Sequence, residues 1–285
     1  MRIKPGLIVA FLAILNILAW IGVYELSEPK ALEVVFFDVG QGDAIFLKTP
    51  QGRQILIDGG PDSAVLEKLG QEMPFWDRTL DLIVLTHPEH DHINGLIEVL
   101  KRYKVDNILW TGVLQDTAEY REWLKLLEGK EAKIYIAKSG LYVKPGLAEI
   151  EILYPFESLE GKEARDINNT SIVLRLVFRD NAFLFTGDIL GSVEEDLLDR
   201  MGEKTDADVL KVAHHGSKTS CREEFLTAVS PETAIISVGK DNKYGHPSQE
   251  VLESLEKYGI KIFRTDLQGD IKIISNGKTY GVSNI

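Results

Sequence analysis

The stretch Thr86–His92, with the sequence THPEHDH, is the feature that most constrains the fold of this chain. Three imidazoles and two carboxylates stand within the six positions from His87 to His92. The apolar run 81–85 before them predicts a short buried strand, and apolar residues recur at helical spacing from Ile93 onwards. The cluster is therefore expected at a strand-to-helix turn, at the edge of a sheet.

Imidazole and carboxylate groups together suit zinc, manganese or iron. In an extended turn the side chains of His87 and Glu89 lean to one side, and those of Asp91 and His92 can converge from the first turn of the helix. The alternative is a polar loop that happens to be rich in histidine. All six histidines lie in short polar segments after apolar runs, and this clustering favours a metal site.

The composition narrows the class of protein. A chain of 285 residues with 44% apolar residues can form one large layered domain or two small ones. The formal net charge of -12 argues against a purely electrostatic nucleic-acid binder. It does not exclude a metal-dependent enzyme that acts on phosphate, because bound cations reverse the local field. One cysteine, Cys221, excludes an intrachain disulfide.

Residues 5–24 contain no charged side chain, and they are long enough to span a bilayer as a helix, which needs about 20 apolar residues. Basic residues before this segment predict a single-pass protein of the cell membrane, with its N-terminus in the cytoplasm and the remainder outside. The alternative is a cleaved signal peptide, which would leave a secreted protein. We expect an anchor and linker at 1–31 and one folded domain at 32–285.

Strands and helices alternate along residues 32–285, which indicates an α/β layered domain. Three strands between residues 32 and 57 are expected to form a meander, and an antiparallel pair is expected within 171–185. Capping sequences predict helices that begin at Ser192 and at Ser220.

Three further candidates follow predicted strands. Asp188 stands where a carboxylate can bridge two metal ions, or where it can stabilise the dipole of the following helix. His214 and His215 are both candidate ligands, but adjacent residues that leave a strand point in opposite directions, so only one is expected to meet a metal. Asp58 fits either an acceptor that orients a ligand histidine or a turn residue.

Two more segments are candidates for contact with substrate. His246 lies between glycine and proline, which fits a substrate-contacting or proton-transfer group, with a capping or buried histidine as the alternative. Ser217, Lys218 and Ser220 precede a predicted helix N-terminus, which favours anions. They are candidate phosphate contacts, and helix capping is the alternative for Ser220.

Seven motifs, taken in order, resemble those of the metallo-β-lactamase superfamily and, more closely, of the extracytoplasmic hydrolase domain of the ComEC competence proteins. They are DVGQGD at 38–43, IDGG at 57–60, THPEHDH at 86–92, NNTS at 168–171, FTGD at 185–188, HHGS at 214–217 and YGHP at 244–247. The resemblance covers about residues 32 to 283. It implies a four-layer αβ/βα sandwich with a two-metal site at the edge of the two sheets.

The resemblance also implies a role for individual residues. It places two divalent ions, zinc or manganese, on a set shared between both halves of the chain: His87 and Glu89 for the first ion, Asp91, His92 and His215 for the second, and Asp188 between them. The position of Glu89 is histidine in most of the superfamily and usually aspartate in the ComEC branch. The third histidine of the first site falls at Asn168 or Asn169, and Asn169 is assigned a supporting role.

The resemblance implies hydrolysis, with Asp91 orienting the attacking hydroxide and His246 meeting the phosphate or the leaving group. We expect a phosphodiesterase or nuclease that acts on DNA outside the membrane in a competence-like role. Its partners would be DNA and a separate DNA-uptake channel protein. Two alternatives stay open: a metallohydrolase of a small ester, lactone or β-lactam-like substrate, and a tethered, non-catalytic DNA-binding module.

Overall fold

The structure is a computed structural model and describes residues 4–27 and 31–284. Contacts divide the chain into two units, residues 1–30 and 31–285. The first unit is the helix α1 (Pro5–Ser27), within which surface exposure is described for residues 6–20. Within the described part of the chain, we find no helix whose length and apolarity suffice for a membrane crossing. The predicted spanning helix at residues 5–24 is therefore not supported.

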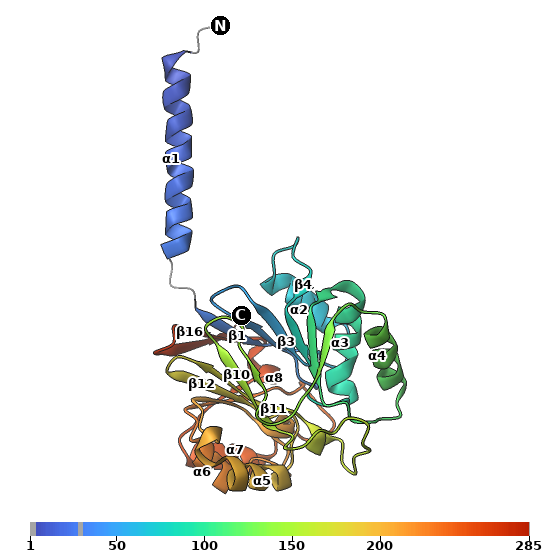
Figure 1. Ribbon diagram of the computed structural model, residues 1–285. Coiled ribbons are helices and arrows are strands. Elements are labelled where there is room, and N and C mark those ends of the chain that lie inside the picture. Colours follow the sequence, from blue (N-terminus) through green and yellow to red (C-terminus); the bar gives the residue numbers. More distant parts are fainter. Residues whose placement is uncertain (1–3, 28–30, 285) are drawn as a thin grey trace. The chain divides into compact units, whose positions relative to one another are not determined.

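The second unit is built on two large β-sheets that pack face to face (Figure 1). The first sheet has the strand order β17-β16-β1-β2-β3-β5-β7-β8. Its strands are β1 (Leu32–Phe36), β2 (Ile45–Lys48), β3 (Gln54–Ile57), β5 (Leu82–Val84), β7 (Asn107–Trp110), β8 (Lys133–Ile136), β16 (Ile271–Ser275) and β17 (Tyr280–Asn284). The strands β1, β2 and β3 form the predicted antiparallel meander, whereas β3, β5, β7 and β8 run parallel.

The second sheet has the strand order β15-β14-β13-β12-β11-β10-β9. Its strands are β9 (Tyr142–Val143), β10 (Glu149–Tyr154), β11 (Val173–Phe178), β12 (Asn181–Phe185), β13 (Val209–Lys211), β14 (Thr233–Ile236) and β15 (Lys261–Arg264). The predicted antiparallel pair is β11 and β12. The short strands β4 (Thr79–Leu80) and β6 (Lys104–Val105) pair separately.

Helices cover the outer face of each sheet (Figure 1). The first sheet carries α2 (Ala64–Glu72), α3 (His90–Arg102) and α4 (Ala118–Glu128), and the second carries α5 (Gly191–Met201), α6 (Glu223–Val229) and α7 (Gln249–Lys257). Short turns of helix complete the domain: α8 (Thr265–Gln268), η1 (Asn168–Thr170), η2 (Gly202–Thr205) and η3 (Ala213–Gly216).

The alternation of side chains along the strands explains these layers. In β1, Val34 and Phe36 belong to the core between the two sheets, whereas Val35 packs with the residues of α2–α4. In β12, Phe183 and Phe185 face the same central core. Because successive side chains of a strand point to opposite faces, each sheet is apolar on both sides and must be covered twice. The predicted four-layer αβ/βα sandwich is confirmed.

The predicted helix caps at Ser192 and Ser220 are wrong. Helix α5 begins at Gly191, and α6 begins only at Glu223. The buried carboxylate of Glu194 instead accepts hydrogen bonds from the backbone N–H groups of Cys221, at 2.5 Å, and Arg222, at 3.0 Å. Glu194 thus satisfies the N-terminal end of α6 from a neighbouring helix, a contact that local sequence cannot reveal.

Candidate metal centre

The candidate ligands meet where strands of both sheets end. His87 follows β5, Asp91 and His92 lie in the first turn of α3, Asp188 follows β12, and His215 lies in η3. Among the described residues, four overlapping groups have potential ligand atoms within 4.8 Å of one another. They are His87 with His92 and Asp188, Asp91 with His92 and His215, Asp43 with Asp188 and His215, and Asp43 with Asp58 and His92. The structure thus brings together residues that lie more than a hundred positions apart.

One carboxylate oxygen lies at the centre of this cluster. The Oδ2 atom of Asp188 lies 3.4 Å from Nε2 of His92 and 3.1 Å from Nε2 of His215. The same nitrogen of His215 lies 3.3 Å from Oδ2 of Asp91. Ligand atoms at such distances can bind a common metal ion.

The cluster contains buried imidazole nitrogens that are free to bind a metal ion. The Nε2 atoms of His87, His92 and His215 are buried and have no hydrogen-bond partner among the described residues. Buried polar atoms nearly always have a partner, so three such nitrogens beside Asp91 and Asp188 need an explanation. Imidazole nitrogens and carboxylate oxygens are the donors that zinc and manganese bind, and this set of residues fits divalent metal ions.

The opposite ring nitrogens are held in place. Nδ1 of His92 donates to Oδ2 of Asp58 at 2.8 Å, and Nδ1 of His215 donates to the carbonyl oxygen of Ser237 at 2.8 Å. Thr86 donates to Asp58 through its backbone N–H at 2.8 Å and its hydroxyl at 2.6 Å. Such bonds fix the ring orientation and leave Nε2 as the acceptor. Asp58 therefore has the geometry of the orienting acceptor, one of its two expected roles.

Two glycines allow α3 to approach the end of β3. The N–H of Gly59 donates to the carbonyl oxygen of His92 at 2.9 Å. A Cβ atom on Gly95 would lie only 1.7 Å from the carbonyl oxygen of Gly59. Close approach of the two backbones requires glycine at both positions, and it places Asp58 within reach of His92.

The charges of the cluster are strongly coupled. Burial alone would lower the pKa of His215, but the nearby carboxylates of Asp188 and Asp91, 3.1 and 3.3 Å from Nε2, raise it to about 10. The pKa of His92 is raised in the same way, against burial, chiefly by Asp188 and Asp58. By contrast, burial and the neighbouring His92 hold the pKa of His87 well below its usual range. The carboxylates around His92 and His215 therefore favour positive charge at their end of the site.

Glu89 stands apart from the compact groups of ligand atoms. It is half-buried at the N-cap of α3, and burial, followed by the charge of Asp91, raises the pKa of its carboxyl. A cation nearby would relieve this repulsion. Its neighbour His90 points to solvent, with 63% of its side chain exposed, and contacts Glu119 instead.

The two asparagines differ in their contacts. The Oδ1 atom of Asn169 accepts from the N–H of Leu190 at 2.9 Å, and its amide donates to Ser192 at 3.3 Å. Asn169 thereby holds the loop that follows Asp188, in agreement with a supporting role. The Oδ1 atom of Asn168 is buried without a hydrogen-bond partner in the described residues, so this asparagine is the one with an oxygen to offer.

His214 and His215 adopt left-handed backbone conformations, with φ of 50° and 54°. This bend turns His215 into the cluster and leaves His214 half-buried, with its ring 5.7 Å from that of His246. Burial lowers the pKa of both His214 and His246.

The segment after His215 divides into supporting and exposed residues. The hydroxyl of Ser220 donates to the carbonyl oxygens of Ala213 and Ser217, both at 3.0 Å, and is therefore not free to contact a phosphate. Ser217 is buried and its hydroxyl contacts that of Thr219 at 2.9 Å. Lys218 is exposed, so it alone of the three candidates presents a charge to solvent.

Two residues of the cluster escape sequence reasoning. Lys211 is fully buried in β13, and its ammonium group forms an ion pair with Asp43. Asp43 also belongs to two of the groups of potential ligand atoms. The available signal is a lysine within the otherwise apolar run 209–213, where exposure to solvent is not expected.

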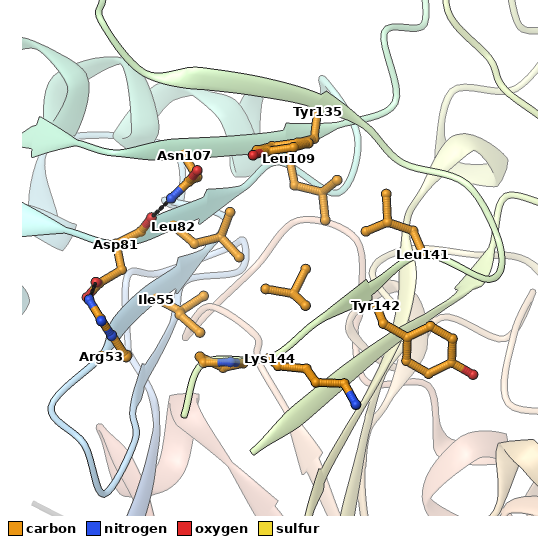
Figure 2. Close-up of a pocket in the computed structure, with 12 residues that line it drawn as sticks. Arg53, Ile55, Asp81, Leu82, Asn107, Leu109, Tyr135, Leu141, Tyr142 and Lys144 are labelled. Carbon is orange, nitrogen blue, oxygen red and sulfur yellow. Dashed lines mark hydrogen bonds and ion pairs between the residues drawn. The ribbon is translucent and has the colours of Figure 1, made fainter. Parts of the chain in front are cut away.

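A cavity of about 440 Å³ opens at the other end of the first sheet, at the amino ends of its parallel strands (Figure 2). Ile55, Leu82 and Leu109 lie along it. Its polar side chains pair with one another, because Arg53 contacts Asp81 at 2.7 Å and the amide of Asn107 donates to the carbonyl oxygen of Asp81 at 2.8 Å. The cavity is remote from the ligand cluster and lacks its chemistry.

Comparison with known proteins agrees with this geometry. Residues 37–240 match the family model described as the metallo-beta-lactamase superfamily. The chain is 34% identical to ComE operon protein 3 of Bacillus subtilis over 257 residues, which cover 84% of this chain and 32% of that protein. It is 32% identical to Competence protein ComA of Neisseria gonorrhoeae over 249 residues, covering 87% and 33%. The chain thus spans about a third of the length of these relatives.

A solved structure supports the fold alone. The metallo-beta-lactamase fold protein YhfI from Bacillus subtilis superimposes with a TM-score of 0.55 at 14% identity, covering 81% of this chain and 96% of that one.

Proposed function

The chain belongs to the metallo-beta-lactamase superfamily, and from that premise we propose that it is a two-metal phosphodiesterase that cleaves DNA. The observation that carries the proposal is the set of three buried imidazole nitrogens beside Asp188, those of His87, His92 and His215, without hydrogen-bond partners in the part of the chain that the structure describes. A non-catalytic binding module has no need of such a set.

The proposed ligands divide between two ions. His87 and Glu89 would hold the first, and Asp91, His92 and His215 the second, with Asp188 between them. Bound zinc or manganese would supply an activated water molecule as nucleophile and stabilise negative charge on the phosphate oxygens.

Other residues of the chain act on substrate and protons. Asp91 would orient the attacking water. The half-buried rings of His214 and His246 are neutral near pH 7, because burial lowers the pKa of each, so His246 can exchange a proton with the leaving oxygen. Lys218 would contact the phosphate backbone.

The relative from Neisseria gonorrhoeae is named a competence protein, and competence is the uptake of DNA. This supports DNA as substrate and a separate DNA-uptake channel protein as partner. Action outside the membrane would require residues 5–24 to cross the membrane, with the basic residues before them on the cytoplasmic side. The formal net charge of -12 favours a second candidate, hydrolysis of a small ester or lactone, because an acidic surface repels DNA.

The test is a substrate screen with the metal-loaded full chain. Labelled single- and double-stranded DNA and bis(p-nitrophenyl) phosphate are compared with a lactone and a thioester. We expect cleavage of DNA and of the model diester. Opening of the lactone or thioester without any diester cleavage would refute the phosphodiesterase and support the second candidate function.

The variant His246→Ala should lower diester cleavage at least about 100-fold, the usual contribution of a positioned acid or base, with metal content unchanged. His90→Ala is the matched control, because His90 belongs to the same motif as the ligands but points to solvent.

A further inference from the structure

Lys211 is a cation placed beneath a site that is expected to bind cations. Its side chain is 0% exposed, in a strand whose two neighbours, β12 and β14, run parallel to it. A buried ammonium group is costly unless several partners compensate it. Such a residue in direct contact with a candidate ligand therefore needs a reason beyond packing.

The ammonium group of Lys211 uses three partners. It forms an ion pair with Oδ2 of Asp43, donates to the carbonyl oxygen of Gly187 at 3.0 Å, and lies 3.4 Å from Oδ1 of Asp188. An ammonium group has three donors, so these contacts satisfy it. Two of the partners, Gly187 and Asp188, belong to the loop that carries the central carboxylate.

The two oxygens of Asp188 therefore face different groups. Oδ1 faces Lys211, whereas Oδ2 faces the Nε2 atoms of His92 and His215 at 3.4 and 3.1 Å. The backbone N–H of Asp188 donates to the hydroxyl of Ser171 at 3.0 Å and fixes the start of the side chain. Rotation of the carboxylate is thus restrained at both ends.

Asp43 holds the lysine and is itself held against the ligands. Its backbone N–H donates to the carbonyl oxygen of Asp91 at 3.2 Å, and its own carbonyl oxygen accepts from Gly60 at 2.8 Å. Its Oδ1 atom lies 3.5 Å from Nδ1 of His215. The pair Asp43–Lys211 thus connects the loop 38–43 to ligands of the second half.

We propose that Lys211, held by Asp43, is a positioning residue that occupies Oδ1 of Asp188 and so keeps Oδ2 turned toward the proposed metal-binding nitrogens of His92 and His215. This inference rests on the proposed function, since it concerns the same metal pair. It adds a role for two residues outside the ligand set. Without Lys211, the carboxylate of Asp188 could turn, and Oδ2 would no longer be held toward His92 and His215.

The test measures metal binding and the magnetic coupling between two manganese ions in the full chain, without any nucleic acid. Lys211→Met keeps an unbranched side chain, one atom shorter than that of lysine, and removes the charge. We expect the affinity for the second ion to fall about 10- to 100-fold, as for other groups that orient metal ligands, and the coupled manganese signal to change.

The double variant Asp43→Asn with Lys211→Met separates positioning from charge balance, and it carries the test if the single variant does not fold. It removes both charges of the pair, so no buried carboxylate is left alone. If Lys211 only balances Asp43, the double variant binds two ions with native affinity and a native coupled signal, and the inference is overturned. A lost or altered second site in the double variant supports it.

Lys272→Met is the matched control. The ammonium group of Lys272 also binds two carboxylates, those of Glu33 at 2.7 Å and Glu72 at 2.8 Å, and neither belongs to the ligand cluster. We expect native metal binding in this variant. Because all readouts are made without DNA, a wild-type protein that binds two manganese ions but cleaves no diester would refute the proposed nuclease and still test Lys211.

Discussion

The polar groups at the two ends of the first sheet differ in burial and in pairing. At the carboxyl ends of its parallel strands, Nε2 of His87 and of His92 is buried without a hydrogen-bond partner among the residues described. At the amino ends, along the cavity of Figure 2, Arg53 pairs with Asp81. On the side of the cavity that the second sheet provides, Lys144 pairs with Glu149 at 2.7 Å. These two lysine and arginine side chains are 67% and 59% exposed.

The difference separates stability from function. A buried polar atom without a hydrogen-bond partner lowers the stability of the fold by about 1–3 kcal/mol. Several such atoms are therefore expected together only where a ligand binds them. Exposed, paired charges cost little and contribute little. Chemistry is therefore expected at the ligand cluster, even though the other end has a well-formed cavity.

The largest effect is expected from Asp188→Asn. This change removes the charge between the two proposed ions, so DNA cleavage should fall more than about 100-fold, the upper figure for residues that only orient ligands. The measurement is the initial rate of diester cleavage at saturating metal. Asp199→Asn, at an exposed position of α5, is the control. Equal rates in the two variants would remove the distinction between the cluster and the surface.

The second effect concerns pH. In the metal-free protein the pKa of His215 is about 10, and the pKa of His92 is also raised. Both rings therefore carry a second proton, and a positive charge, at pH 7. Metal binds the neutral ring, so loading should release about two protons, and affinity should rise with pH. Titration calorimetry in buffers of different ionisation enthalpy counts these protons. Release of none would mean that the imidazoles do not bind metal.

The raised pKa of His215 also affects the stability of the metal-free fold. A histidine whose pKa is higher in the folded than in the unfolded state stabilises the fold fully below pH 6.5. That contribution is lost as pH rises through about 10, the folded value for His215. Unfolding by urea at pH 6 and pH 9 measures the loss, and metal-loaded protein should not show it.

Removal of metal should lower thermal stability. At a free metal concentration of 100 times Kd, binding to the folded state contributes about 2.7 kcal/mol to the free energy of unfolding. A domain of this size should therefore lose several degrees of melting temperature in chelator and regain them when metal is restored. An unchanged melting temperature would mean that no metal binds the ligand cluster, and the cluster would then not differ from the paired groups of the cavity.

The smallest effect is expected at the cavity. Arg53→Ala breaks an exposed ion pair, so the free energy of unfolding should change by less than about 1 kcal/mol. Metal content and cleavage should stay native. A loss of cleavage in this variant would show that the two ends of the sheet are coupled, and it would break the comparison.

The sequence predicts the layers and the ligand cluster because both depend on local patterns. The apolar run at 81–85 and the helical spacing after it place the cluster 87–92 correctly at a strand-to-helix turn. The same reasoning brings Asp188 and His215 to ends of neighbouring strands, which the parallel pairing of β12 and β13 then sets side by side.

Contacts between distant segments cannot be predicted in this way. Glu194 looks like part of a local capping box, yet its carboxylate binds the N–H groups of Cys221 and Arg222. Lys211 looks like an isolated charge in a strand, and its partner Asp43 lies 168 positions earlier in the chain. Ser220 looks like a phosphate contact, but its hydroxyl donates to backbone oxygens of its own loop. Only the packed structure decides these roles.

The most direct test of the account is the number of metal ions per chain, measured by elemental analysis of the full chain after loading with zinc or manganese and removal of free metal. The proposed site, with three unpartnered imidazole nitrogens in the described chain beside Asp188, predicts about two ions per chain. Asp188→Asn should retain fewer. A wild-type protein that retains no metal would contradict the account, because the buried nitrogens of His87, His92 and His215 would then have no ligand to complete them.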